Sequence, residues 1–177
     1  MSWVLQRLAR DHDIGKSENA KNDYVRSMMM AKNYNVLDQT REGNSSTGAD
    51  AGEIDILIND ARGQLFTIIE ALKLSSVDTT KILEHYLKLL HNYNPLQVQR
   101  TFLITYYDGN NFEQWWERYI IYIRGLTTDN IGLSENAVIT GAETVTTLYP
   151  SLKKLVHQFT QHGESFCCIH YAIKVLR

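Results

Sequence analysis

The chain has 177 residues, of which 44% are hydrophobic and only two are proline. A chain of this length and composition buries enough apolar surface to fold as one globular domain, which excludes a disulfide-stapled mini-protein and a globally disordered chain. The formal net charge is -2, from 18 Lys and Arg against 20 Asp and Glu. The chain therefore lacks the overall basic excess that is typical of nucleic-acid-binding proteins, and any surface that binds nucleic acid must be local.

Two features bear on the cellular compartment. Cys167 and Cys168 are adjacent in an apolar run, where they resemble small buried side chains more than a disulfide, and this favours a reducing compartment. No apolar stretch has the length needed to cross a bilayer, and Arg7 and Arg10 interrupt any signal-like run at the start. We therefore expect a cytoplasmic protein without a membrane partner.

The first predicted elements are helical. Residues 2–10 have a helical period and predict a lead-in helix or a loose arm, within a segment 1–16 that precedes a single domain over residues 17–177. Ser17 is a suitable N-cap for a helix that reaches Lys32.

The following elements are predicted from periodicity and turn residues. Alternating apolar residues indicate strands, a 3.6-residue apolar period indicates helices, and Gly, Pro and Asn mark the turns. In chain order these patterns predict an edge strand at 33–39, a polar loop at 41–52, a hairpin of strands 53–58 and 64–72, a helix at 79–93, a strand at 101–107 and a helix at 112–123. This order is typical of an α/β protein with a central mixed β-sheet flanked by helices.

The C-terminal part leaves two alternatives open. Residues 155–161 and 165–176 fit a β-hairpin around His162 and Gly163, although the apolar spacing over 152–159 also fits a helix. The final run is rich in β-favouring residues, so we predict a strand there.

The hairpin at 53–72 carries acidic residues in unusual places. Alternate residues of an extended segment share a face, so Glu53 and Asp55 point one way and the isoleucines among them point the other way. Glu70 lies in the apolar run LFTIIEAL, where a buried strand normally excludes a carboxylate. Carboxylates that converge at the end of a hairpin can hold Mg2+ or Mn2+, which suits phosphodiester hydrolysis. The sequence therefore predicts a metal site.

Structural alternatives stay open for these acids. The two acids of the first strand are also what an exposed edge strand carries to discourage unwanted pairing. Glu70 has a structural alternative, which ranks below the metal site, as the buried ion-pair partner of Lys73, Lys88 or Arg100.

A lysine beside the acids would orient water or stabilise negative charge. Lys73 is closest in sequence to Glu70, but a bulge is needed to bring residues with this spacing to one face of a strand. The predicted helix at 79–93 offers Lys88 instead, because one stripe of that helix lies beside its apolar face. The stripe comprises Lys81, His85, Lys88 and Asn92. On an ordinary amphipathic helix such a stripe is the solvated side.

Four phrases of the sequence resemble a known family. They are YNVLDQTREGNSSTGADAGEIDILI, FTIIEALKLSSVD, ILEHYLKLLHNYNP and TFLITYYDGNNFEQWWERYIIYI. Between about Glu18 and about Tyr122 the chain resembles the PD-(D/E)XK nuclease superfamily, in particular the nuclease-like domains attached to bacterial STAND-type ATPases and other anti-phage defence proteins. The resemblance implies a restriction-endonuclease-like core, a Mg2+ or Mn2+ cofactor and DNA as the substrate.

The resemblance also implies roles for individual residues. It makes Asp55 the first metal-binding acid and Glu70 the second, and Glu53 and Glu18 look like supporting acids. Gln39, in the phrase DQTREG, looks like a residue that supports the site or orients the substrate.

The helix phrase after the motif contains His85 as a supporting residue and Lys88 as a catalytic candidate. The chain departs from the family at the lysine. It reads EALK from Glu70 to Lys73, where the family has Glu-x-Lys.

Together these residues predict a Mg2+-dependent endonuclease that acts in anti-phage defence. Asp55 and Glu70 would hold the cation with help from Glu53, and Lys73 or Lys88 would orient the attacking water. A near-neutral chain binds a polyanion poorly alone, so we expect a homo-oligomer or an ATPase or sensor partner to activate it. The alternative, favoured by the altered lysine spacing, is a non-catalytic nuclease-like module that serves binding or assembly.

Overall fold

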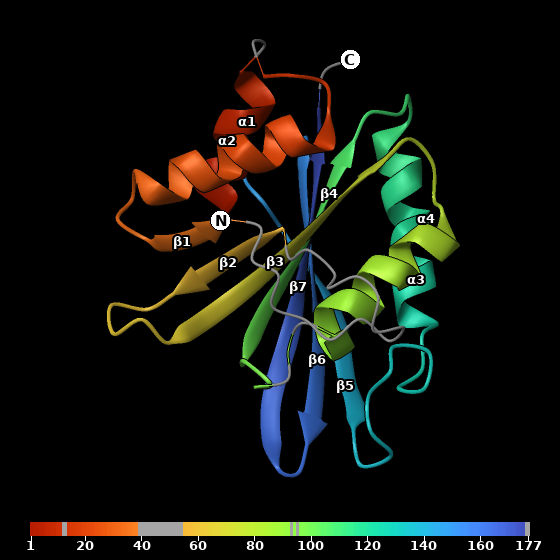
Figure 1. The fold of residues 1–177 in the computed structure, drawn as a ribbon. Coiled ribbons are helices and arrows are strands. Elements are labelled where there is room, and N and C mark those ends of the chain that lie inside the picture. The colour runs from red at the N-terminus through yellow and green to blue at the C-terminus, as the bar shows by residue number, and fades with distance from the viewer. Residues whose placement is uncertain (12–13, 39–54, 93, 95, 176–177) are drawn as a thin grey trace, which may run out of the picture.

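The computed structural model describes residues 1–11, 14–38, 55–92, 94 and 96–175. Within these ranges the chain forms helices and strands in mixed order (Figure 1). The helices are α1 (Ser2–Arg10), α2 (Glu18–Met30), α3 (Thr79–Leu87) with a π-helical turn η1 (Lys88–Asn92), and α4 (Phe112–Arg124). The strands are β1 (Asn35–Asp38), β2 (Ile56–Asn59), β3 (Leu65–Leu74), β4 (Arg100–Tyr107), β5 (Val138–Val145), β6 (Leu152–Gln161) and β7 (Glu164–Lys174).

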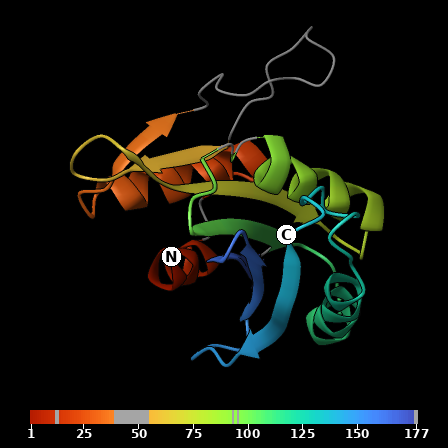
Figure 2. The ribbon, with the colours of Figure 1, turned by 90° about the horizontal axis from the view of Figure 1, so that it is seen from below.

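The strands form one mixed sheet in the order β1-β2-β3-β4-β7-β6-β5. β4 pairs in parallel with both β3 and β7, and the other neighbours are antiparallel. Figure 2 shows the twist of the sheet, with β5 to β7 turned strongly away from the direction of β2 and β3. Parallel central strands are normally covered on both faces, and this sheet follows the rule.

Each face of the sheet has its own hydrophobic core. On one face α1 and α2 bury Leu5 and Val25 against Ile69 and Ile104. On the other face α3, η1 and α4 bury a larger set that includes Trp115 and several tyrosines. The architecture is therefore helices, sheet, helices, which confirms the predicted α/β class with a mixed sheet flanked by helices.

Several expected elements are present with small changes of boundary. Ser17 caps α2, because its hydroxyl accepts a hydrogen bond from the Ala20 N–H. The segment before α2 contains a helix and not a loose arm, since α1 buries Val4, Leu5 and Leu8. The helix expected at 79–93 is α-helical only to Leu87 and continues as the π-helical turn.

The C-terminal hairpin is confirmed, and the alternative of a helix over 152–159 is wrong. β6 and β7 pair antiparallel from Leu152 opposite Ile173 to Gln161 opposite Glu164. The turn between them has positive φ at His162 (52°) and Gly163 (82°), as a tight two-residue hairpin requires. β5 was not predicted. Within the described residues, no helix combines the length and apolar character needed to cross a membrane.

Candidate functional site

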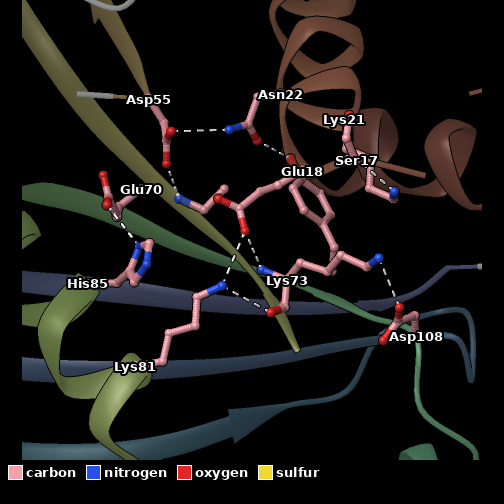
Figure 3. Close-up of polar contacts among 12 residues, drawn as sticks. Ser17, Glu18, Lys21, Asn22, Asp55, Glu70, Lys73, Lys81, His85 and Asp108 are labelled. Carbon is pink, nitrogen blue, oxygen red and sulfur yellow. Dashed lines mark hydrogen bonds and ion pairs between the residues drawn. The ribbon is translucent and has the colours of Figure 1, made fainter. Parts of the chain in front are cut away.

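Asp55 lies immediately before β2, and its carboxylate reaches two other elements. Oδ2 accepts a hydrogen bond from the Ala71 backbone N–H at 2.8 Å, and Oδ1 accepts one from Asn22 Nδ2 at 3.1 Å. β2 pairs with β3 through Ile56 opposite Ile69, so one step along this register brings Asp55 beside Glu70, as Figure 3 shows. The structure thus brings the two acids together across the β2–β3 pair, as the predicted hairpin implied.

Glu70 is buried inside the sheet at the middle of β3, with 2% of its surface exposed. Its Oε1 lies 2.9 Å from Nδ1 of His85, which α3 places over the strand. Its other oxygen, Oε2, is buried and has no hydrogen-bond partner among the described residues. A buried carboxylate oxygen without a partner is costly, and Oε2 is an acceptor that the described part of the chain leaves without a donor.

Glu18 joins these acids from the first turn of α2. Its Oε2 accepts a hydrogen bond from the Lys73 backbone N–H at 2.7 Å and lies 3.5 Å from Lys81 Nζ. The N–H groups of alternate residues point to the same side of a strand. The Asp55 carboxylate therefore accepts from the Ala71 N–H, and the Glu18 carboxylate from the Lys73 N–H, on the side of β3 that faces β2. The Ala71 carbonyl faces that side as well.

Burial and mutual repulsion shape the ionisation of the acids. The pKa of Asp55 is raised to about 7, first by burial and then by the negative charge of Glu70, while the Ala71 N–H opposes the shift. The pKa of Glu70 is raised by burial, and the hydrogen-bonding and charge of His85 oppose this. In both carboxylates the cost of burying the negative charge exceeds the stabilisation that the neighbouring donors and positive charges provide.

The lysines divide between the two faces of the sheet. Lys73 Nζ pairs with Asp108 at 3.0 Å and does not reach Glu70, because β3 pairs regularly with β4 from Ile69 to Leu74. The bulge that Lys73 needed is absent from this pairing, so the lysine lies on the opposite face from Glu70. Lys88, by contrast, acts on Glu70 by its charge.

The helical stripe that contains Lys88 faces the acids. Lys81 Nζ contacts Glu18 and donates to the Lys73 carbonyl at 3.2 Å, and His85 contacts Glu70. The stripe is therefore not simply the solvated side of the helix. The position two residues after Glu70, where the family has its lysine, is Leu72, which is fully buried.

The residues present fit a hard divalent cation in part. Asp55 and Glu70 supply carboxylate oxygens, which Mg2+ and Mn2+ prefer, and Glu70 Oε2 is a buried acceptor to which no described residue donates. No group of three or more His, Cys, Asp or Glu side chains among the described residues is arranged to hold a metal ion. The predicted third acid, Glu53, and the predicted supporting residue Gln39 lie outside the described residues.

The sequence did not single out Asn22 and Tyr106. Tyr106 on β4 donates its hydroxyl hydrogen to Asn22 Oδ1 at 2.9 Å, and Asn22 in turn contacts Asp55. The one available signal was the position of Asn22 one helical turn after Glu18, which places both side chains on one face of α2.

Comparison with known proteins adds no relative to this description. The chain matches no family model, no curated protein and no solved structure. The resemblance to the PD-(D/E)XK superfamily thus stays a prediction that rests on the sequence phrases.

Proposed function

We propose that this chain is a Mg2+- or Mn2+-dependent nuclease with a restriction-endonuclease-like core, and that its site lies where β2 meets β3. The single observation that carries the proposal is a pair of neighbouring carboxylates, the partly buried Asp55 and the buried Glu70, with one oxygen of Glu70 unpartnered among the described residues. Two such groups in a low-dielectric site repel each other, and a divalent cation is the partner that relieves this repulsion.

In this proposal the surrounding residues have distinct tasks. Asp55 and Glu70 bind the cation through carboxylate oxygens, and His85 holds Glu70 by its Oε1 so that Oε2 stays available. Lys81 and Lys88 bring positive charge from the helical stripe towards the phosphate of the substrate. When bound, the cation supplies positive charge at the scissile phosphate and acidifies water.

The wider assignment depends on the resemblance. DNA is the proposed substrate, and anti-phage defence is the proposed setting, with a homo-oligomer or an ATPase or sensor partner as the activating assembly. The resembling phrases correspond in sequence to β1 and β2, to β3, to α3 with η1, and to β4 with α4, so the proposed core consists of the elements that carry the two acids. The two acids and the stripe belong to this shared stretch.

The test is cleavage of plasmid and linear DNA with Mg2+, Mn2+ or EDTA over a wide range of protein concentration. Asp55→Asn and Glu70→Gln remove the charges with little change of shape, and Glu135→Gln makes the same change at an exposed position. We expect metal-dependent nicking that both site variants lose and that Glu135→Gln retains. The melting temperature of each variant with and without Mn2+ reports binding to the folded protein.

The outcomes separate the nuclease from its rival. Mn2+ binding that depends on Asp55 and Glu70, without cleavage at any concentration, would support a binding module. Absence of both cleavage and Mn2+ binding would overturn the metal-dependent nuclease.

One observation favours a second candidate function, a non-catalytic nuclease-like module that serves binding or assembly. Leu72 occupies the position of the family lysine and is fully buried in the core beneath α3 and α4. A lysine at this position would have its charge buried among apolar groups, so the packing of the core favours an apolar residue there. Fold alone does not secure activity.

A further inference from the structure

A buried polar chain leads from the sheet through α2 to Asp55. It begins at Tyr106, which is fully buried on β4, and passes through Asn22, of which 3% is exposed. The Tyr106 hydroxyl donates to Asn22 Oδ1 at 2.9 Å, and Asn22 Nδ2 donates to Asp55 Oδ1 at 3.1 Å. Residues far apart in sequence are thus joined in one line of hydrogen bonds.

The chemistry of the amide gives this line a direction. Asn22 offers one acceptor and one donor group, and only the donor suits an ionised carboxylate. Because the Tyr106 hydroxyl donates to Oδ1, the amide nitrogen is turned towards Asp55. A flipped amide would set Oδ1 against the carboxylate oxygen, and two acceptors repel each other.

Asp55 is consequently held at both of its oxygens by donors from different elements. The Ala71 N–H of β3 holds Oδ2, and the Asn22 amide of α2 holds Oδ1. Two donors on the two oxygens fix the rotation of the carboxylate, whereas one donor leaves it free to swing about the remaining bond. Each carboxylate oxygen keeps a further lone pair for another ligand.

We propose that Asn22 and Tyr106 are positioning residues of the candidate site: Tyr106 orients the Asn22 amide, and the amide holds Asp55 in the orientation in which its free lone pairs bind a divalent cation. This inference rests on the proposed function, since it takes Asp55 as a cation ligand. Neither residue touches the cation or the substrate. Tyr106 acts only through Asn22.

The experiment compares Mn2+ affinity, measured by titration of the full chain, in wild type and in three variants. Tyr106→Phe removes the hydroxyl that orients the amide, and Asn22→Ala removes the amide. Tyr119→Phe is the matched control, because it removes an equally buried hydroxyl that contacts His170, at 2.8 Å, on the other face of the sheet. Urea unfolding of each variant measures the purely structural loss.

We expect Asn22→Ala to weaken Mn2+ binding by about tenfold and Tyr106→Phe by a few-fold, as is typical for residues that orient a metal ligand. Tyr119→Phe should lose stability without a change in Mn2+ affinity. The double variant Asn22→Ala/Tyr106→Phe should bind Mn2+ as Asn22→Ala does, because Tyr106 has no path to Asp55 without the amide.

Other results overturn the inference in distinguishable ways. Equal Mn2+ affinity in Tyr106→Phe and Tyr119→Phe, or additive losses in the double variant, would overturn the positioning roles and leave the proposed metal site intact. A wild-type chain that binds no Mn2+ would overturn the proposed function and this inference with it. If Tyr106→Phe does not fold, Asn22→Ala against wild type decides the case.

Discussion

Asp55 keeps its proton to a higher pH than an exposed aspartate, because its carboxylate is buried beside Glu70. Its pKa is about 7 in the folded chain, against about 3.9 for an unfolded aspartate. Between these values the folded chain binds more protons than the unfolded chain. The free energy of unfolding therefore falls as the pH rises from about 4 to about 7 and is level above that range.

Asp55→Asn should remove this loss of stability at higher pH. Without a divalent cation, we expect the variant to be more stable than wild type at pH 8 by on the order of 2 kcal/mol, and nearly equal to it at pH 4.5. Urea unfolding in EDTA across this pH range measures the difference, and Glu135→Gln serves as the exposed control. A difference that does not change with pH would mean that burial of Asp55 does not disfavour its charge.

At the scale of the element, the start of α2 determines where two site residues lie. Glu18 and Asn22 are one turn apart, and the turn before them is closed by Lys21, of which 4% is exposed. Lys21 Nζ donates to the carbonyls of Gly15, Lys16 and Ser17 at 3.1, 2.9 and 3.2 Å. One buried ammonium thus satisfies three backbone acceptors at the entry of the helix.

Lys21→Met should leave these three carbonyls without their donor while keeping much of the side-chain volume. We expect a loss of about 1–2 kcal/mol in the free energy of unfolding, because three part-buried carbonyls lose their hydrogen bonds to a charged donor. Lys16→Met makes the same chemical change at an exposed neighbour and should alter stability by less than about 0.5 kcal/mol. Equal losses in the two variants would show that the carbonyls find other donors, such as water.

The elements differ in how far the sequence predicts them, for physical reasons. α2 and the β6–β7 hairpin were predicted because Ser17 and the His162–Gly163 turn act locally. β5 carries no apolar alternation, since most of its residues are exposed on this edge strand, and only its pairing with β6 defines it.

The candidate site likewise combines features that local sequence patterns predict with features that depend on long-range contacts. The proximity of Asp55 and Glu70 follows from the local β2–β3 hairpin, which the sequence predicts from two strand-like segments separated by a turn. The line from Tyr106 to Asn22 joins residues 84 positions apart, so no local pattern predicts it. Whether Lys73 lies on the same face of β3 as Glu70 depends on whether the strand contains a bulge. The spacing of the two residues in the sequence does not show whether a bulge is present.

At the scale of the whole molecule, a second polar network ties both flanking helices to the sheet on the face opposite α2. Tyr86 of α3 contacts His157 Nδ1 at 2.7 Å, and Tyr119 of α4 contacts His170 Nδ1 at 2.8 Å. His170 Nε2 also lies 3.3 Å from the Tyr86 hydroxyl. Both histidines are buried in the larger core, so protonation of either brings a charge into an apolar environment.

This network makes stability fall in acid, in the opposite sense to Asp55. Burial lowers the pKa of His157 to about 4 and lowers that of His170 well below its usual range. An unfolded histidine titrates near about 6.5. As the pH falls below that value, the unfolded chain takes up protons that the folded chain does not, so the free energy of unfolding decreases. The contribution of His157 to this decrease ends near pH 4.

His157→Gln should remove one group that takes up a proton in the unfolded chain but not in the folded chain. Between pH 4.5 and 6, we expect the slope of unfolding free energy against pH to be smaller than in wild type by up to about 1.4 kcal/mol per pH unit. The control is His162→Gln, which makes the same chemical change in the exposed turn between β6 and β7 and should leave the slope unchanged. If His157→Gln and His162→Gln gave the same slope, His157 would be protonated within the core, and the network would have to open to water on that side of the sheet.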